Sequence, residues 1–129
     1  MTDINLSAEL AECTINVQRL HHLIAILESV PEESFDLSLW RRESPCGTIA
    51  CAVGWACADP LFNAQELTYR GGLPVYTDAY TGWEAVEAFF GLTRELAHWL
   101  FDVSYYESVL PTRSNVIKRV MEAVLKDHS

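Results

Sequence analysis

Three cysteines in one short segment are the first candidates for chemistry. Cys46, Cys51 and Cys57 are spaced C-x4-C-x5-C, whereas structural zinc sites separate paired cysteines by about two to four residues. On a helix, Cys46 and Cys51 would point about 140° apart, so their thiolates would not converge on one ion. The spacing therefore favours buried thiols that behave as small hydrophobic side chains, and we expect no metal and no other cofactor.

Cys46 has a second interpretation, as a nucleophile. It stands where a helix is expected to begin, and a helix N-terminus lowers the pKa of a thiol. A nucleophile also needs a base within reach, and His98 is the histidine that we would expect to fold back toward it. The structural alternative is a tight turn, in which Gly47 gives backbone freedom and the Thr48 hydroxyl meets unpaired N–H groups. We favour the turn and keep a cysteine-dependent enzyme using Cys46 as the alternative.

The acidic side chains concentrate in one stretch of the sequence. Between Gly71 and Thr112 there are six acidic residues and a single basic one, Arg94, with aromatic residues lying between them. An acidic surface with tyrosines suits docking onto a basic protein groove, because charge speeds the encounter and aromatic rings anchor the complex. A solvated acidic surface over core aromatics is the alternative. The expected partner-binding residues are Asp78, Glu84, Glu87, Glu95, Asp102, Glu107, Tyr105 and Tyr106.

No familiar catalytic motif accompanies these residues. The sequence contains no Gly-rich phosphate loop, nucleophile elbow or H-E-x-x-H motif. Neighbouring carboxylates such as Glu84 and Glu87 are interpreted as charges near a helix start. The histidines are interpreted as residues at the boundaries of apolar helix faces. We therefore expect that the protein is not an enzyme.

Composition and charge limit the classes of partner. The 129 residues carry 18 acidic and 9 basic side chains, a net charge of −9, which would be repelled by nucleic acids and anionic membranes. Half of the residues are hydrophobic, which is enough for a packed core. The first residues lack the basic and apolar regions of a signal peptide, and no apolar run approaches the ~20 residues that span a bilayer. We expect a cytoplasmic protein with reduced thiols.

The clearest predicted element is a long helix that ends before Pro31, because proline disfavours helical geometry in the residue before it. Its apolar residues alternate at spacings of four and three, which places them on one helical face. They are Leu6, Leu10, Cys13, Val17, Leu20, Ile24 and Leu27. About three heptads could also pair with a second copy as a coiled coil. A homodimer joined along this helix therefore stays an alternative to packing within the chain.

The segment from Cys46 to Ala58 contains no charged residue. An element that is apolar on all sides suits a helix buried at the centre of a small fold. Ala50, Gly54 and Ala58 recur every four residues, and a glycine inside a helix costs about 1 kcal/mol relative to alanine. We therefore expect another backbone to pass close to Gly54 and the other helices to pack around this segment.

Three shorter helices are predicted in the second half of the chain. Thr81 to Glu84 has the spacing of a capping box, which would open a helix that ends at Gly91. Thr93 is the expected N-cap of the next helix, and Thr112 or Ser114 that of the last. The expected inward face of the last helix consists of Val116, Ile117, Val120, Met121 and Val124.

Residues 67–76 could add one short β-hairpin. Gly71 and Gly72 would form its turn, and Pro74 would restrict it to an edge of a sheet. The fold class expected from these patterns is mainly α. Residues 1–129 would form a single helical domain, a bundle of about five helices around the central apolar helix.

Three segments have the order and spacing of a family pattern. They are residues 35–40 (FDLSLW), residues 46–56 (CGTIACAVGWA) and residues 90–101 (FGLTRELAHWLF). Together they resemble an uncharacterised group of small phage, prophage and bacterial proteins. Its segments read F-[DN]-[LM]-x-x-W, C-G-T-x-x-C-x-x-G-x-A and G-L-x-x-x-x-A-x-x-L-F. The resemblance spans most of residues 35–101 and implies a phage or bacterial cytoplasmic setting, but no activity.

The sequence therefore predicts a small acidic protein-interaction module, phage-encoded by its resemblance, that binds a basic surface of a host or phage protein. Inhibition of a nucleic-acid-handling defence enzyme is one concrete version, because such enzymes expose basic grooves. The alternative is the cysteine-dependent enzyme that uses Cys46.

Overall fold

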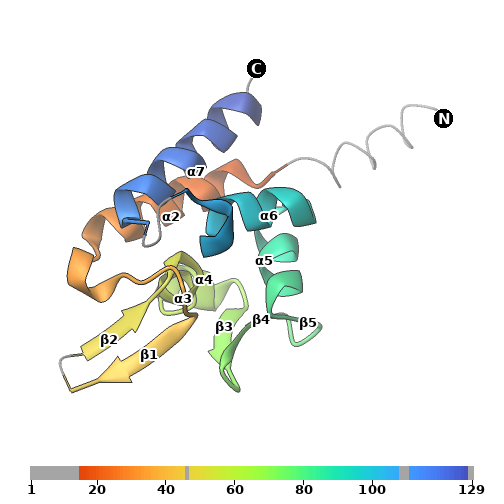
Figure 1. Ribbon diagram of the computed structural model, residues 1–129. Coiled ribbons are helices and arrows are strands. Elements are labelled where there is room, and N and C mark those ends of the chain that lie inside the picture. Colours follow the sequence, from red (N-terminus) through yellow and green to blue (C-terminus); the bar gives the residue numbers. More distant parts are fainter. Residues whose placement is uncertain (1–14, 46, 108–110, 128–129) are drawn as a thin grey trace.

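The computed structural model describes residues 15–45, 47–107 and 111–127. Figure 1 shows two long helices, α2 and α7, lying along one side of the molecule, with the strands on the opposite side. No helix in these described ranges is long and apolar enough to cross a membrane. In chain order, with η for 3₁₀ helices, the elements are α2 (Val17–Ser29), η1 (Glu32–Ser34), β1 (Arg41–Ser44), β2 (Gly47–Ala50), α3 (Ala52–Ala56), α4 (Pro60–Ala64), β3 (Leu67–Arg70), β4 (Leu73–Tyr76), β5 (Tyr80–Thr81), α5 (Trp83–Phe90), α6 (Arg94–Phe101), η2 (Val103–Tyr105) and α7 (Arg113–Asp127).

α2 and α7 pack against each other in opposite directions (Figure 1). Arg113, the first residue of α7, donates hydrogen bonds to the carbonyls of Leu27 and Glu28 near the end of α2. Each helix buries one apolar face, and burial of this kind supplies most of the stability of a helix in a protein. The buried residues are Leu20, Leu23, Ile24 and Leu27 in α2 and Val116, Val120, Ala123 and Val124 in α7.

The predicted end of the first helix and the predicted start of the last are confirmed. The prediction of one continuous helix from Leu6 to Leu27 is wrong, since Asn16 has extended backbone and is the N-cap of a helix that begins only at Val17. Val30, which precedes Pro31, has extended backbone and ends α2. The Thr112 hydroxyl accepts a hydrogen bond from the backbone N–H of Asn115 at the start of α7. The inward prediction for Met121 is wrong, since its side chain is 46% exposed. Leu6, Leu10 and Cys13, predicted for the first helix, lie outside the described residues.

The predicted hairpin is confirmed as β3 and β4, which pair with Leu67 opposite Tyr76 and Arg70 opposite Leu73. Gly71 and Gly72 form the two-residue turn with φ of 63° and 83°, a backbone region that favours glycine. The expected edge position of Pro74 is wrong, because β5 pairs with the other side of β4. β4 tolerates the proline since β5 has only two residues, and Pro74 takes part there through its carbonyl, which accepts from the Gly82 N–H at 2.9 Å.

The expected fold class, a mainly α bundle of about five helices, is wrong. The described residues form six α-helices and two small antiparallel sheets, β1–β2 and β3–β4–β5, which is a mixed α and β fold. The error lies in the apolar segment, where residues 47–50 form a strand instead of a helix. They pair with Arg41–Ser44, a charged stretch whose sequence suggests a loop that connects two elements. Hydrophobicity alone cannot separate a short buried strand from a buried helix.

The expected burial is confirmed only for the middle of this segment, since Gly47 and Ala58 are exposed and Thr48 and Ile49 are half-buried. Every residue from Ala50 to Cys57 is buried except Trp55, which is half-buried. The helix α3 within it is only one turn and a half long, and it packs on α2. A β-carbon on Gly54 would lie 1.8 Å from the carbonyl oxygen of Trp40, so the expected close approach of another backbone is confirmed.

α5 and α6 each contain eight residues, and the signals predicted for their ends are confirmed in part. The predicted capping box at Thr81 is wrong: Thr81 lies in β5, and Gly82, with φ of 61° and no side chain to cap with, precedes α5. The predicted stop at Gly91 is confirmed by its left-handed φ of 68°. The Thr93 cap of α6 is also confirmed, since its hydroxyl accepts from the Leu96 N–H at 3.1 Å.

Candidate functional site on helices α5 and α6

A cleft of about 230 Å³ lies between residues 37–40, the start of α5 and the end of α6. Its floor is closed to solvent, because Leu37, Cys51 and Phe101 are only 4%, 2% and 3% exposed. Two half-buried indoles, Trp40 and Trp83, line it as well. Their ring centroids are 5.2 Å apart and their planes are inclined by 58°. The cleft is therefore aromatic and apolar over most of its lining.

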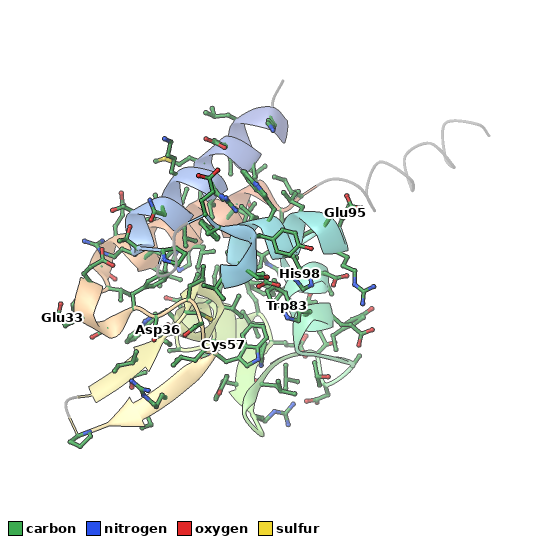
Figure 2. The ribbon with its side chains drawn as sticks, viewed as in Figure 1. Glu33, Asp36, Cys57, Trp83, Glu95 and His98 are labelled. Atoms are coloured by element: carbon green, nitrogen blue, oxygen red, sulfur yellow. The ribbon has the colours of Figure 1, made fainter. Side chains whose placement is uncertain are left out.

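Helix α5 brings an aromatic side chain to this cleft, and the end of α6 brings a carboxylate. Trp83 is the first residue of α5, while His98 lies near the end of α6 and Asp102 directly follows it. His98 and Asp102 are four residues apart, so they share one helical face. Figure 2 shows Trp83 and His98 next to each other, with Glu95 farther along α6 near its start.

Asp102 is held by hydrogen bonds on both carboxylate oxygens. Its Oδ2 lies 2.7 Å from His98 Nδ1, and its Oδ1 accepts from the N–H and hydroxyl of Ser104. Burial works to raise the pKa of Asp102, but the hydrogen bonds from His98 and Ser104 outweigh it and hold that pKa below its ordinary value. The carboxyl is thus ionised at neutral pH, and His98 is the donor. The other contact of His98 is with Trp83, stacked at 4.1 Å between ring centroids.

The His98–Asp102 pair has the form of an oriented base but lacks a nucleophile. A carboxylate that fixes an imidazole is the arrangement that activates hydroxyls and thiols in hydrolases. In the part of the chain that the structure describes, no hydroxyl or thiol bonds to His98 Nε2. The arrangement can bind and orient polar groups, but it does not assemble a catalytic triad.

The two cysteines that the structure describes are protonated and enclosed. The Cys51 sulfur accepts from the Gly54 N–H at 3.4 Å and lies 3.7 Å from the Trp40 carbonyl oxygen. Burial raises the pKa of Cys51 to about 11 and that of Cys57 to about 12, so neither thiol is ionised at neutral pH. Within the described ranges, no group of three potential ligands among His, Cys, Asp and Glu is positioned to hold a metal ion.

Cys46 lies outside the described residues, but the premise of its proposed reactivity does not hold. The helix was expected to begin at Cys46, whereas residues 47–50 form β2 and the helix begins at Ala52, with Cys51 as its N-cap. The helix start on which that expectation rests therefore lies farther along the chain, at Cys51. His98, the base considered for it, is instead engaged by Asp102 and Trp83.

The structure brings four of the predicted partner-binding acids onto two adjacent helices. Glu95 and Asp102 flank His98 at helical spacing along α6, and Glu84 and Glu87 are three residues apart on α5. Glu84 and Glu95 are exposed, and Glu87 is half-buried. Among the described residues, these three glutamates form no ion pair.

The other two predicted acids do not join this group. Asp78 lies in the turn between β4 and β5, where Arg70 pairs with its carboxylate. Glu107 lines a shallow depression together with the cationic side chains of Lys118 and Arg119. Asp78 is thus paired with a cation, and Glu107 lies beside α7, so neither adds to the acidic surface of α5 and α6.

The two predicted tyrosines have different roles. Tyr105 is 52% exposed and its ring centroid lies 5.7 Å from that of His98. Tyr106 donates its hydroxyl hydrogen to the Leu100 carbonyl at 2.6 Å, and Arg119 lies 3.7 Å above its ring. Burial raises the pKa of Tyr106 to about 12. Tyr106 is therefore engaged within the fold, while Tyr105 is available at the surface.

Sequence reasoning did not identify the cleft itself. Trp83 lies in the acidic stretch and Trp40 in the first segment of the family pattern, and neither position indicates a shared site. No local signal pairs them, because Trp40 reaches Trp83 only through the folding of residues 37–40 over Gly54.

No family model, curated protein or solved structure matches this chain.

Proposed function

We propose that this protein is a small acidic interaction module that binds a basic surface of another protein. The binding region, called the docking surface below, consists of Glu84, Glu87, Glu95, Asp102 and Tyr105. The observation that carries the proposal is that its three glutamates have no ion-pair partner within the described residues, and that one of them, Glu95, lines a surface depression together with the exposed Tyr105.

Electrostatics supports this assignment over Asp78 and Glu107, the two predicted acids that lie beside cations. A carboxylate beside a cation, such as Asp78 beside Arg70, produces a weak electrostatic field at a distance, because the two charges cancel. Unpaired carboxylates on adjacent helices produce a stronger negative field, because their contributions add. That field reaches about 8–10 Å at physiological salt. It attracts a basic partner and speeds the encounter, and it repels nucleic acids and anionic membranes.

Aromatic groups beside these charges provide the anchoring that charge alone lacks. Tyrosine and tryptophan are enriched among the residues that dominate binding energies at interfaces, because they bury a large rigid surface. Tyr105 is exposed next to His98, and Trp83 lines the neighbouring cleft. The docking surface therefore combines long-range attraction with short-range contact area.

The setting that we propose is the cytoplasm of a bacterium or of a phage-infected cell. It rests on the resemblance of residues 35–101 to small phage and bacterial proteins. In that setting, a concrete partner is a nucleic-acid-handling defence enzyme, whose basic groove the docking surface would occupy. Such an inhibitor would compete with the enzyme's nucleic acid for the same positive charges.

Affinity capture with charge-reversed variants tests the proposal. The docking variant carries Glu84→Lys, Glu87→Lys and Glu95→Lys, and leaves Asp102 intact because its carboxylate holds His98 and Ser104. The control variant reverses three exposed glutamates elsewhere: Glu28→Lys, Glu33→Lys and Glu66→Lys. Both variants have the same net charge, so a general charge effect would change both equally.

Immobilised wild type and variants are incubated with lysates of uninfected and phage-infected bacteria, and bound proteins are quantified by mass spectrometry. We expect wild type and control to capture the same basic protein in equal amounts. The docking variant should capture at least about tenfold less of that protein. Equal capture by the two variants, or capture of no basic protein by wild type, would contradict the proposal.

A further inference from the structure

The cleft beside the docking surface has the chemistry of a receptor for an organic cation. Trp40 and Trp83 line it next to each other, with ring centroids 5.2 Å apart, and the negative faces of indole rings attract cations within about 6 Å. Its floor is apolar, which suits the methylene stem of a long cationic side chain. Asp102 stands at the same cleft with an ionised carboxylate.

The carboxylate of Asp102 can accept one further hydrogen bond. Two carboxylate oxygens offer about four lone-pair positions. Three are occupied, by His98 Nδ1 and by the N–H and hydroxyl of Ser104. The donors that occupy them also fix the carboxylate in place, so an incoming donor meets an acceptor that is already oriented.

We propose that this cleft receives the guanidinium group of an arginine side chain from the basic partner. This inference rests on the proposed function, and it adds the chemical group that the partner inserts. One N–H of the guanidinium donates to Asp102, its plane lies against an indole of Trp40 or Trp83, and its stem lies over the apolar floor.

Arginine fits these features better than lysine. Its guanidinium is planar, is more weakly hydrated than an ammonium, and can stack on an aromatic face while its edge donates hydrogen bonds. An arginine of this protein already combines stacking with hydrogen bonding. Arg119 lies over the rings of Trp99 and Tyr106, and its guanidinium donates to the Trp99 carbonyl. A lysine ammonium would satisfy Asp102 but would lose more hydration and would not stack.

Titration of the full chain with short peptides tests the inference by NMR. The probe is a capped pentapeptide with one arginine between glycines. Matched peptides carry lysine or citrulline, the latter being an uncharged analogue of arginine. The readout is the indole N–H signals of the four tryptophans, assigned by single substitutions. Trp40 and Trp83 line the cleft, whereas Trp55 and Trp99 do not and serve as internal controls.

We expect the arginine peptide to produce saturable shifts of the Trp40 and Trp83 signals, with Trp55 and Trp99 unchanged. The lysine peptide should bind more weakly and the citrulline peptide should give no saturation. Asp102→Asn, which keeps an oxygen acceptor for Ser104, should weaken arginine binding roughly three- to tenfold. Glu28→Gln, which removes an exposed charge that does not line the cleft, should change it by less than about twofold.

Three results would overturn the inference: no shift of Trp40 and Trp83, equal shifts of all four indoles, or binding of citrulline or lysine as strong as that of arginine. Because the titration uses no partner protein, its failure leaves the result of the capture experiment intact. Conversely, saturable arginine binding together with equal capture by the two charge-reversed variants would contradict only the proposed function.

Discussion

Gly54 lies directly against the carbonyl of Trp40, so closely that a β-carbon at position 54 would be 1.8 Å from that oxygen. The absent side chain lets Trp40 lie close to α3, where the Cys51 N–H donates to the carbonyls of Leu39 and Trp40, and Trp40 packs against Trp83. The glycine in the apolar segment is thus needed because a side chain at position 54 would collide with the Trp40 carbonyl. It determines the position of one wall of the cleft.

The first prediction follows from this contact. Gly54→Ala should destabilise the fold by about 2–4 kcal/mol, because the added methyl group would collide with the backbone of Trp40 and force it to move. Urea unfolding followed by far-UV circular dichroism measures the change. Gly71→Asn is the control: Gly71 has open space around it and a φ of 63°, which asparagine tolerates, so the change should be below about 1 kcal/mol. Equal stability of Gly54→Ala and wild type would show that the close approach does not exist.

The second prediction concerns the enclosed thiols. In a variant with Cys13→Ser and Cys46→Ser, only Cys51 and Cys57 remain. Since burial raises their pKa values to about 11 and 12, both should be protonated at pH 8 and unreactive toward a disulfide reagent in the folded protein. In denaturant both should react within minutes. Rapid labelling of either thiol in the native state would contradict their burial.

The same reagent tests the alternative enzyme that uses Cys46. Wild type labelled at neutral pH, with the modified residues identified by mass spectrometry, gives the rate at Cys46. We expect a rate no faster than that of free cysteine, because the helix begins at Ala52 instead of near position 46. Labelling many times faster than free cysteine would revive the nucleophile hypothesis.

The third prediction is a pH dependence of stability at Asp102. Its pKa is lowered in the folded protein, so its ionised form stabilises the fold above the ordinary aspartate pKa of about 4, and this contribution is lost as pH falls below that range. Asp102→Asn should therefore be less stable than wild type at pH 7, and the difference should shrink as pH falls below about 4. Thermal unfolding across this range measures it. A difference that is the same at pH 7 and at low pH would exclude the charge as its cause.

The fourth prediction separates the two adjacent tyrosines. Tyr106→Phe removes the hydrogen bond to the Leu100 carbonyl and should cost about 1 kcal/mol of stability, with partner capture unchanged. Tyr105→Ala removes an exposed ring and should reduce capture while changing stability by less than about 0.5 kcal/mol. Loss of capture by Tyr106→Phe alone would contradict the roles assigned to both residues.

Local signals in the sequence predicted much of the fold. The paired glycines at positions 71 and 72 identified the β3–β4 hairpin, and Pro31, Gly91 and Thr93 marked helix ends that the structure confirms. Each of these signals acts within a few residues, through allowed φ values or a single hydrogen bond. The capping box at Thr81 failed because strand pairing took Thr81 into β5, which no local pattern reveals.

Pairing between distant or dissimilar segments could not be predicted. The strand β2 is apolar and β1 is charged, so neither shows the alternation by which a half-buried strand is recognised. The acidic stretch was visible in composition, but only the fold shows that Asp78 pairs with Arg70 while Glu84, Glu87 and Glu95 have no such partner in the described residues. The Trp40–Trp83 pair likewise depends on tertiary structure alone.

The most direct test of the proposed docking surface is to map the contact on the protein itself. The chain is labelled with ¹⁵N, and backbone amide signals are followed while the partner isolated by affinity capture is added. We predict that the signals that shift or broaden first belong to α5, α6 and Tyr105, with Glu84, Glu95 and Asp102 among them. Changes confined to α2, α7 or the β1–β2 hairpin would contradict the account.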